Sequence, residues 1–472
     1  MILERLRYTP IGWTKVYEFN EADQRCALDL VDELIDSFGE RSNLSPDKIP
    51  WEAIRTILCQ TLYGGKIDND FDAKILSSLA EQFFTPKCFD HDFPLFDAAN
   101  QSEMLTIPDV TKTSQFVEWI NNLPAVESPA WSGLPVNVEK VLKEQQTEYL
   151  LSRIWQIQDA NEEAVVLESV TETKKAVKKE GPQQLKWLRE LGEKANLYIQ
   201  ILPTALEKLN RTSGSITNPL FRFLEREVTV ASKLLSTLKT NLGDVKNLCE
   251  GKIQSTADLR KLALQLYADK VPDGWKKYRV ANLSVSDWLT DFKKRLDQFN
   301  RIIPQKEYRN SYMFEDFTNS CFFFKIIDRQ GVWMGGLLFP EAYLTATRQA
   351  IAQDHQWSLE ELELKVVIYQ KEELDEDSFL VSGLFIEGAQ WDADSKQLVL
   401  SEEMRFALPT LKFTWIRVNK ADKGAVQDGE ILVPVYLNRS RSNLLFSIKL
   451  QCGKIPRTTL YQKGVALIAC EN

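Results

Sequence analysis

Between Gly335 and Tyr369 the spacing of hydrophobic residues changes from a helical to a strand-like period, and this change limits the folds that the chain can adopt. Two glycines and an apolar run lead to Pro340, which suits the first position of a helix because its missing N–H would have no partner there. Small and apolar residues then recur at three- and four-residue spacing, at Tyr343, Ala346, Thr347, Ala350 and Ile351. From Leu364 onwards, β-branched and aromatic residues follow with a period near two. We therefore expect mostly helices before this point and strands after it.

The first 130 residues are predicted to form a helical bundle. Asn20 can cap a first helix that ends near Gly39. A second helix begins at Pro50–Trp51 and stops at Gly64–Gly65, and Asp68 can cap a third. A fourth carries the apolar residues Phe116, Trp119, Ile120 and Leu123. Each helix has one apolar stripe and a polar back, so the four must pack against one another.

Two segments are candidate domain boundaries. Residues 124–135 are rich in proline, and residues 303–318 combine charged with aromatic side chains. After the first boundary, a helix over residues 137–157 has a middle that is polar all round, which indicates a bridging helix. Asp159–Pro182 is dense in Glu and Lys and poor in aromatic residues, so it is predicted to be a mobile linker. We interpret its lysines as solvated, and the alternative is that they contact an acidic surface.

Helices should continue up to the second boundary. Leu185–Leu202 is predicted to be a helix that Pro203 kinks, and two further helices are expected at Thr256–Asp269 and Ser286–Asn300. The clearest helix is capped by Asn218 and ends at Gly251. Its apolar stripe could mean a dimeric coiled coil, but the neighbouring helices offer partners within the same molecule, so we favour a bundle helix.

Short strand-like runs fill the last part of the chain, and their spacing suggests an antiparallel barrel or sandwich. The predicted strands are Cys321–Ile327, Leu364–Tyr369, Phe379–Glu387, Lys412–Asn419, Ile431–Leu437, Leu444–Leu450 and Val465–Cys470. The core candidates on them are Val381, Leu384, Ile386, Trp415, Ile416, Val433, Val435, Leu445, Phe446 and Ile448.

Composition excludes several classes of protein. The 472 residues, 44% hydrophobic, are enough for more than one core. A formal charge of −9 argues against nucleic acid or an anionic membrane as the main partner, and no apolar run is long enough to insert into a membrane. Seven widely spaced cysteines without a Cys-x-x-Cys pair read as reduced, mostly buried thiols of a cytosolic protein.

No constellation of catalytic or ligand-binding residues can be assembled from this sequence. Tyr63–Lys66 lacks the spacing of a phosphate-binding loop and follows a helix, so we interpret it as a helix stop. His91 and His355 have no recognisable nucleophile nearby, and Cys88 with His91 is a single ligand-like pair. The acidic run Glu372–Asp377 lacks the pattern of a calcium loop. We therefore predict no catalytic, cofactor-binding or metal-binding residue in this protein.

Several stretches of the sequence resemble the cytoplasmic dynein heavy chain family, and they occur in the same order as in that family. The most specific are Leu338–Tyr343 (Leu-Phe-Pro-Glu-Ala-Tyr) and Trp357–Leu362 (Trp-Ser-Leu-Glu-Glu-Leu). Ser45–Trp51, Tyr63–Asn69 and Pro219–Glu227 also resemble it. Tyr63–Asn69, Pro219–Glu227 and the Pro340–Leu362 run depart from the axonemal pattern, so the cytoplasmic type fits better.

This resemblance implies an α+β multidomain protein. Residues 1–130 would be the small helical lid subdomain of the sixth AAA+ module of a motor ring. Residues 131–305 would be the helical part of the dynein C-terminal domain, and residues 306–472 its antiparallel β-barrel. The partners implied are neighbouring AAA+ modules of the same heavy chain, the dynein intermediate, light intermediate and light chains, microtubules, and a second heavy chain in a homodimer.

The function implied is a structural and regulatory one, because ATP and magnesium would be bound by other modules of the parent motor. The segment would complete the ring of a minus-end-directed microtubule motor in the cytoplasm and modulate its force or processivity. The alternative is a free-standing helical and β interaction module that acts as an adaptor. An open reading frame several thousand residues long that contains this segment would rule out the adaptor.

Overall fold

The computed structural model describes residues 1–470, except for 39–44, 91–92, 96–105, 107, 109, 125–126, 145, 148–149, 152, 155–181, 207–208, 210, 212–216, 277–283, 303–330, 371–373, 376, 402–404 and 419–425. Some sequence predictions lie outside the described residues. They are the strand Cys321–Ile327, the boundary at 303–318, and the linker Asp159–Pro182 except for its last residue.

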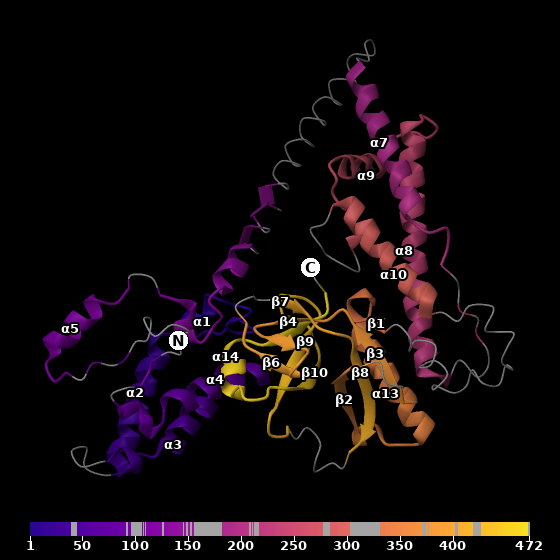
Figure 1. The fold of residues 1–472 in the computed structure, drawn as a ribbon. Helices are drawn as coiled ribbons and strands as arrows, with labels where there is room; N and C mark the ends of the chain where they lie inside the picture. The colour runs from indigo at the N-terminus through magenta and orange to yellow at the C-terminus, as the bar shows by residue number, and fades with distance from the viewer. Residues whose placement is uncertain are drawn as a thin grey trace. The chain divides into compact units, whose positions relative to one another are not determined.

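The protein forms two compact units, and neither is continuous in sequence. The first unit contains Met1–Lys143, Gly383–Leu408 and Ala425–Glu471, and the second contains Glu144–Ser382 and Pro409–Gly424. The C-terminal part of the sequence is therefore shared between the two units. Figure 1 labels the helices and strands of both. The domain limits at 130/131 and 305/306 stay predictions.

The described helices of the first unit include α1 (Ile2–Leu6), α2 (Glu21–Phe38), α3 (Trp51–Thr56), α4 (Asp70–Phe83), α5 (Thr113–Asn121) and α14 (Arg457–Gln462). Of these six, α2 and α4 begin with a side-chain cap. Asn20 caps α2 as predicted, since its Oδ1 accepts hydrogen bonds from the N–H groups of Ala22 and Asp23. The prediction that Asp68 caps α4 is wrong: Asn69 does so, at 2.8 Å from the N–H of Phe71, while Asp68 pairs with Lys15.

The helix predicted after Pro50 changes its hydrogen-bond pattern half-way. α3 continues directly into a π-helical turn, η2 (Ile57–Leu62), and then into the 3₁₀ turn η3 (Gly64–Lys66). Glycine is required at position 64, because a Cβ there would lie 1.6 Å from the carbonyl oxygen of Cys59. The stop expected at these glycines is therefore confirmed.

The predicted mutual packing of the four N-terminal helices holds for α2 but not for α5. α2 contacts η2, and Leu30, Val31 and Leu34 of its predicted apolar stripe are half-buried. No residue of α5 is buried, and Val117 and Ile120 are at least half exposed. An apolar stripe shows that a helix face needs a partner, but it does not say that the same molecule supplies that partner. The buried faces in this part of the unit belong instead to α3 and α4.

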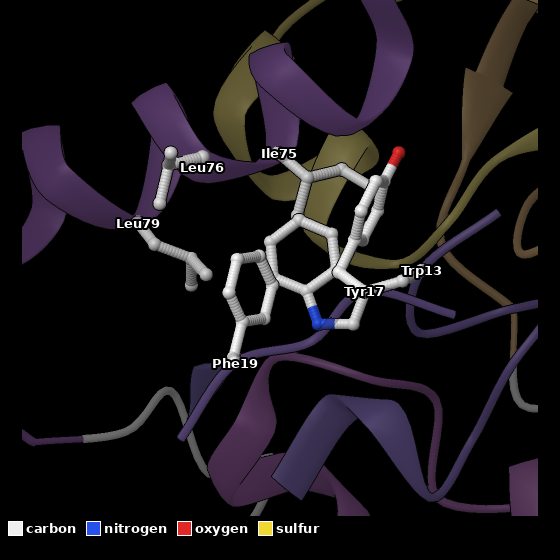
Figure 2. Close-up of a cluster of buried hydrophobic side chains, with 6 residues drawn as sticks. All are labelled: Trp13, Tyr17, Phe19, Ile75, Leu76 and Leu79. Atoms are coloured by element: carbon white, nitrogen blue, oxygen red, sulfur yellow. The ribbon is translucent and has the colours of Figure 1, made fainter. Parts of the chain in front are cut away.

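An aromatic cluster beside α4 forms the centre of the first unit. Trp13, Tyr17 and Phe19 lie on the extended segment after α1 and pack edge-on or tilted, with ring centroids 5.5–6.0 Å apart. Figure 2 shows these three rings beside Ile75, Leu76 and Leu79 of α4. Trp13 is completely buried, so this short segment contributes as much core as a helix would.

The first unit also contains a five-stranded sheet in the order β10-β9-β11-β4-β7. Its strands are β4 (Phe385–Glu387), β7 (Arg405–Ala407), β9 (Glu430–Tyr436), β10 (Leu444–Gln451) and β11 (Ala466–Ile468). The pairing of β11 with β9 is parallel and the others are antiparallel. A separate hairpin joins β5 (Gln390–Asp392) to β6 (Gln397–Val399).

Helices dominate the second unit. They are α7 (Pro182–Ile201), α8 (Pro219–Cys249), α9 (Ala257–Tyr267), α10 (Val285–Ile302) and α13 (Pro340–His355). α8 is capped by Asn218 as predicted and packs along α7, which supports the bundle interpretation of its apolar stripe. α7 ends at Ile201, before Pro203, so the proline follows the helix and does not kink it.

A four-stranded sheet completes the second unit, in the order β1-β3-β8-β2. Its strands are β1 (Val332–Trp333), β2 (Leu362–Ile368), β3 (Ser378–Ser382) and β8 (Leu411–Arg417). The helix predicted from Pro340 is α13, and it lies between α8 and this sheet. The Tyr343 ring of α13 packs on Phe223 of α8 and on Phe379 of β3.

The described strands do not close into the predicted antiparallel β-barrel. They form separate sheets in two units, and each of the larger sheets contains a parallel pairing. The predicted strand Phe379–Glu387 is in fact β3 and β4, which belong to different sheets on either side of Gly383. Gly383 has φ +73°, a conformation that turns the backbone and that glycine adopts without strain. Apolar alternation alone does not reveal such a turn.

Most of the predicted core residues are buried, although they belong to two cores. Val381, Leu384, Ile386, Trp415, Val433, Val435 and Ile448 are buried, whereas Ile416, Leu445 and Phe446 are half-buried. The expectation for the cysteines is wrong in part. The six that the structure describes are free thiols as predicted, but only Cys452 among them is buried.

Candidate functional site

A fully buried arginine connects three distant segments of the first unit. Arg5 of α1 donates from Nε to the carbonyl oxygen of Gly12 at 3.0 Å. Its Nη1 donates to the carbonyl oxygens of Ser132, at 2.6 Å, and Gln462, at 3.0 Å. Gln462 is the last residue of α14, so one guanidinium ties the first helix of the sequence to its C-terminal turn. We call Arg5, Gly12, Ser132 and Gln462 the Arg5 junction.

The glycines next to these carbonyls explain how the backbone comes so close to Arg5. A Cβ on Gly12 would lie 2.1 Å from the carbonyl oxygen of Arg5. Gly133 follows Ser132 with φ +75°, and a Cβ there would be 3.1 Å from Cβ of Gln462. Residues with a side chain at these positions would push the three segments apart.

Three backbone carbonyl oxygens and the nearby Asp72 carboxylate stabilise the charge on Arg5. Burial lowers the pKa of the Arg5 guanidinium to about 9, the nearby Asp72 carboxylate opposes this shift, and the group stays charged at neutral pH. The guanidinium also lies 5.7 Å from the centre of the Trp13 ring. A buried charge of this kind is strongly destabilising if its partners are removed, so the three carbonyls must stay in place.

A second buried arginine holds the same C-terminal turn. Arg441 donates from Nη2 to the carbonyl oxygen of Gly464 at 2.9 Å and to the Glu387 carboxylate at 3.0 Å. Glu387 is itself buried and lies 3.7 Å from Nε of Arg439. The carbonyls of residues 462 and 464 are thus each bound by a buried guanidinium.

α14 is also fixed to α4 through side chains. The Gln462 amide nitrogen donates to Oε1 of Gln82 at 2.8 Å and to the carbonyl oxygen of Ser78 at 3.4 Å. The Lys74 ammonium lies 4.8 Å from the Phe71 ring centre and 5.7 Å from that of Tyr461. Leu460 is completely buried. Because side chains of both helices take part in these contacts, α14 and α4 should move as one body.

The side chains with the potential for chemistry are engaged in ordinary structural contacts. Lys66 binds the Asp23 carboxylate at 2.7 Å and the carbonyl oxygen of Glu18, so it is paired within the unit. His355 contacts Asp377 at 2.8 Å and stacks on Trp357. His91 lies outside the described residues. Within the described ranges, no group of three or more His, Cys, Asp or Glu side chains could hold a metal ion.

A cavity of about 400 Å³ lies between α8, α9 and the loop after α9 in the second unit. Asp244, Asp258 and Asp273 line it together with Trp275. Lys261 and Lys276 lie 3.9 and 3.6 Å from the Asp273 carboxylate, which offsets part of its charge. The residues that line the wall include no pairing of an acid or base with a nucleophile, so its geometry indicates no reaction.

Sequence reasoning missed every residue of the Arg5 junction. An arginine inside the short apolar run Ile2–Leu6 looks like a solvated charge on a helix, since long charged side chains are rarely fully buried. The signal available was indirect: Gly12 and Gly464 stand at positions that no predicted turn required. Ser132 and Gln462 lie more than a hundred residues from Arg5 in sequence, and no local pattern encodes such pairings.

Comparison with known proteins assigns both parts of the sequence. Residues 144–469 match the C-terminal domain of dynein heavy chains, and residues 1–138 match their AAA lid domain. The protein is 47% identical over 99% of its length to a cytoplasmic dynein heavy chain of Paramecium tetraurelia, and 37% identical over 99% to that of Drosophila melanogaster. Identity to the axonemal dynein heavy chain 8 of Homo sapiens is 24% over 94%.

The sequence spans about a tenth of the length of these curated relatives. The Arg5 junction lies where the two matched regions meet in space, because Arg5, Gly12 and Ser132 fall in the first and Gln462 in the second. None of the helices in the described part of the protein is both long and apolar enough to span a membrane.

Proposed function

Since the chain belongs to the cytoplasmic dynein heavy chain family, we propose that it is a structural and regulatory element of the AAA+ motor ring. In this proposal the C-terminal segments of the first unit brace the lid, and the protein has no catalytic site of its own. It changes the force or processivity of a minus-end-directed microtubule motor by altering how nucleotide-driven movements reach the lid.

The observation that carries this proposal is the Arg5 junction. Residues 1–138 match the lid, but they share one compact unit with residues 383–408 and 425–471, which lie almost entirely in the match to the C-terminal domain. The buried charge of Arg5 joins the two at the carbonyl oxygen of Gln462, and such a contact is lost abruptly when the geometry fails. A force applied to the lid would therefore be shared with the five-stranded sheet.

The exposed apolar residues of α5 support further contacts with neighbouring protein. Val117 and Ile120, three residues apart on one face of α5, are at least half exposed. Such faces usually mark protein contacts. We assign them to neighbouring AAA+ modules of the same heavy chain. The wider partners, namely the intermediate, light intermediate and light chains, microtubules and a second heavy chain, belong to the parent complex in the cytoplasm.

The test is a conservative change of the junction in a dynein heavy chain that carries this sequence. Arg5→Lys keeps the charge, but its single ammonium cannot reproduce the fork that reaches Gly12, Ser132 and Gln462. We expect altered stall force or run length of single motors, with basal ATP turnover within a few-fold of the parent. Arg7→Lys is the matched control, because Arg7 is largely exposed and pairs with the neighbouring Glu4.

Two results would overturn the proposal. A folded Arg5→Lys motor without ATP turnover would place an essential catalytic contact in this unit. Hydrogen exchange around residues 460–464 first confirms that Arg5→Lys loosens the Arg5 junction. Unchanged stall force and run length in that loosened motor would then show that the junction transmits no force.

A further inference from the structure

Two stretches that resemble the dynein family meet in the second unit. Pro219–Glu227 forms the first turns of α8, and Leu338–Tyr343 leads into α13. The Arg226 guanidinium lies 4.0 Å from the centre of the Phe339 ring. Glu227 accepts hydrogen bonds from the backbone N–H groups of Leu338, at 3.0 Å, and Phe339, at 2.7 Å. The force-transmitting role proposed above uses neither of these contacts.

The Glu227 carboxyl group, which lies on α8, serves as the N-terminal cap of α13. Phe339 occupies the N-cap position of α13 but makes no side-chain capping bond, and Pro340 follows without an N–H. Glu227 is completely buried, so no water replaces its bonds. The group that satisfies the N–H groups of Leu338 and Phe339 is therefore a carboxyl group of α8.

The segment before α13 is held from α10 as well. Gln298 accepts from the N–H of Trp333 at 2.9 Å and donates to its carbonyl oxygen at 3.2 Å. Arg295 donates to the Asp291 carboxylate at 2.8 Å and approaches the carbonyl oxygen of Leu337 at 3.4 Å. Gly336 has no room for a side chain, since a Cβ would lie 2.3 Å from the Trp333 ring. Movement of residues 333–339 must therefore break contacts to both helices.

The charges around Glu227 leave its protonation finely balanced. Burial raises the pKa of the Glu227 carboxyl to about 7. The N–H groups of Leu338 and Phe339 oppose this shift, as do the cations Arg295 of α10 and Arg226 of α8. Arg295 is itself paired with Asp291, which reduces the positive charge available to Glu227.

We propose that Glu227 is a protonation-sensitive clamp between α8 and the start of α13. In the closed clamp the buried carboxyl binds the N–H groups of Leu338 and Phe339. In the open clamp these N–H groups separate from it and water reaches the carboxyl. The clamp controls how firmly α13, and with it the sheet that carries Phe379, is held on α8.

The direction of the pH effect follows from linkage. The closed clamp keeps its proton up to about pH 7, whereas a solvated Glu loses it near its ordinary value of 4.5. Opening therefore releases a proton between these values, and raising the pH favours opening. The opening constant should rise by up to about tenfold per pH unit over this window and level off above it.

Hydrogen exchange with mass spectrometry on the 472-residue protein tests the clamp. Peptides that cover 335–342 are compared at about pH 5.5 and about pH 7.5, on either side of the raised pKa, after correction for the intrinsic exchange rate. We expect weaker protection at the higher pH in the natural protein and little pH dependence in Glu227→Gln, which cannot ionise. Glu225→Gln is the matched control: it lies on the same helix and pairs with the largely exposed Arg211, so the pH dependence should remain.

Equal protection at both pH values in the natural protein would overturn the proposal. So would a pH dependence that persists in Glu227→Gln, because another group would then be titrating. If Glu227→Gln does not fold, Arg295→Gln replaces it. Removing this cation should raise the midpoint of the pH dependence, and an unchanged midpoint would contradict the clamp. Motor force and run length play no part in this test, so it fails or succeeds independently of the brace.

Discussion

Two arginines of the first unit use their charge to bind backbone, which is unusual for residues that mostly face solvent. Arg5 contacts three carbonyl oxygens, and Arg441 contacts one carbonyl and the buried Glu387. A guanidinium presents five donors in a fixed plane, so it can reach several segments at once. Replacing either arginine by an apolar residue would leave buried carbonyls without these partners, each costing about 1–3 kcal/mol.

Two glycines with positive φ differ in how closely other atoms approach them, so replacing them by alanine should cost unequal amounts of stability. Gly464 has φ +67°, and a Cβ there would lie 2.6 Å from the carbonyl oxygen of Ile11. Gly429 has φ +83°, but the nearest atom to its Cβ is 3.8 Å away. Gly429→Ala should cost about 1 kcal/mol for the backbone conformation alone, and Gly464→Ala should cost about 3 kcal/mol or more. Urea denaturation of the two variants measures both values, and equal losses would contradict the close packing.

Among the elements, helix ends were the most predictable features. Asn20, Asn218 and Pro340 stand where α2, α8 and α13 begin, because capping depends on residues only two or three positions apart. The assignment of strands to sheets was not predictable. Gly383 separates β3 from β4, and nothing local distinguishes a strand that continues from one that leaves for another sheet. α14 was missed because its six residues carry too little periodicity.

The cap of α4 gives a prediction at the level of one element. Asn69 accepts from the N–H groups of Phe71 and Asp72, whereas Asp68 pairs with the exposed Lys15. Asn69→Ala should therefore lower the free energy of unfolding by about 1 kcal/mol. Asp68→Ala removes a surface ion pair and should change the free energy of unfolding much less. Thermal unfolding distinguishes the two, and the reverse order would restore Asp68 as the cap.

At the scale of the whole molecule, the protein should neither bind nor hydrolyse ATP by itself. Tyr63–Lys66 follows a π-helical turn and contains the 3₁₀ turn η3, whose Lys66 is paired with Asp23, so it offers no cradle of N–H groups for phosphate. Titration calorimetry of the 472-residue protein with magnesium and ATP should show no saturable heat. A magnesium-dependent site of micromolar affinity would mean that a phosphate-binding site exists where no motif indicates one.

The sharing of the C-terminal part between two units makes the response to cleavage unusual. The charge-rich segment Asp159–Pro182 is where limited proteolysis should cut first, because its composition cannot support a packed core. Cutting that starts inside α8 would contradict this assignment. A cut within the segment leaves an N-terminal fragment that lacks 383–408 and 425–471, which complete the first unit.

The two fragments should nevertheless stay together. α4 remains covered by α14 of the other fragment, and Arg5 remains bound to Gln462 across the cut. Gel filtration of the nicked protein should therefore give one species of the original size, which separates into two bands only on a denaturing gel. Arg5→Lys should weaken this association and Arg7→Lys should not, since the largely exposed Arg7 pairs with Glu4 of its own helix. Fragments that separate under native conditions would show that these contacts do not hold the C-terminal segments on residues 1–143, and the lid would then have no brace.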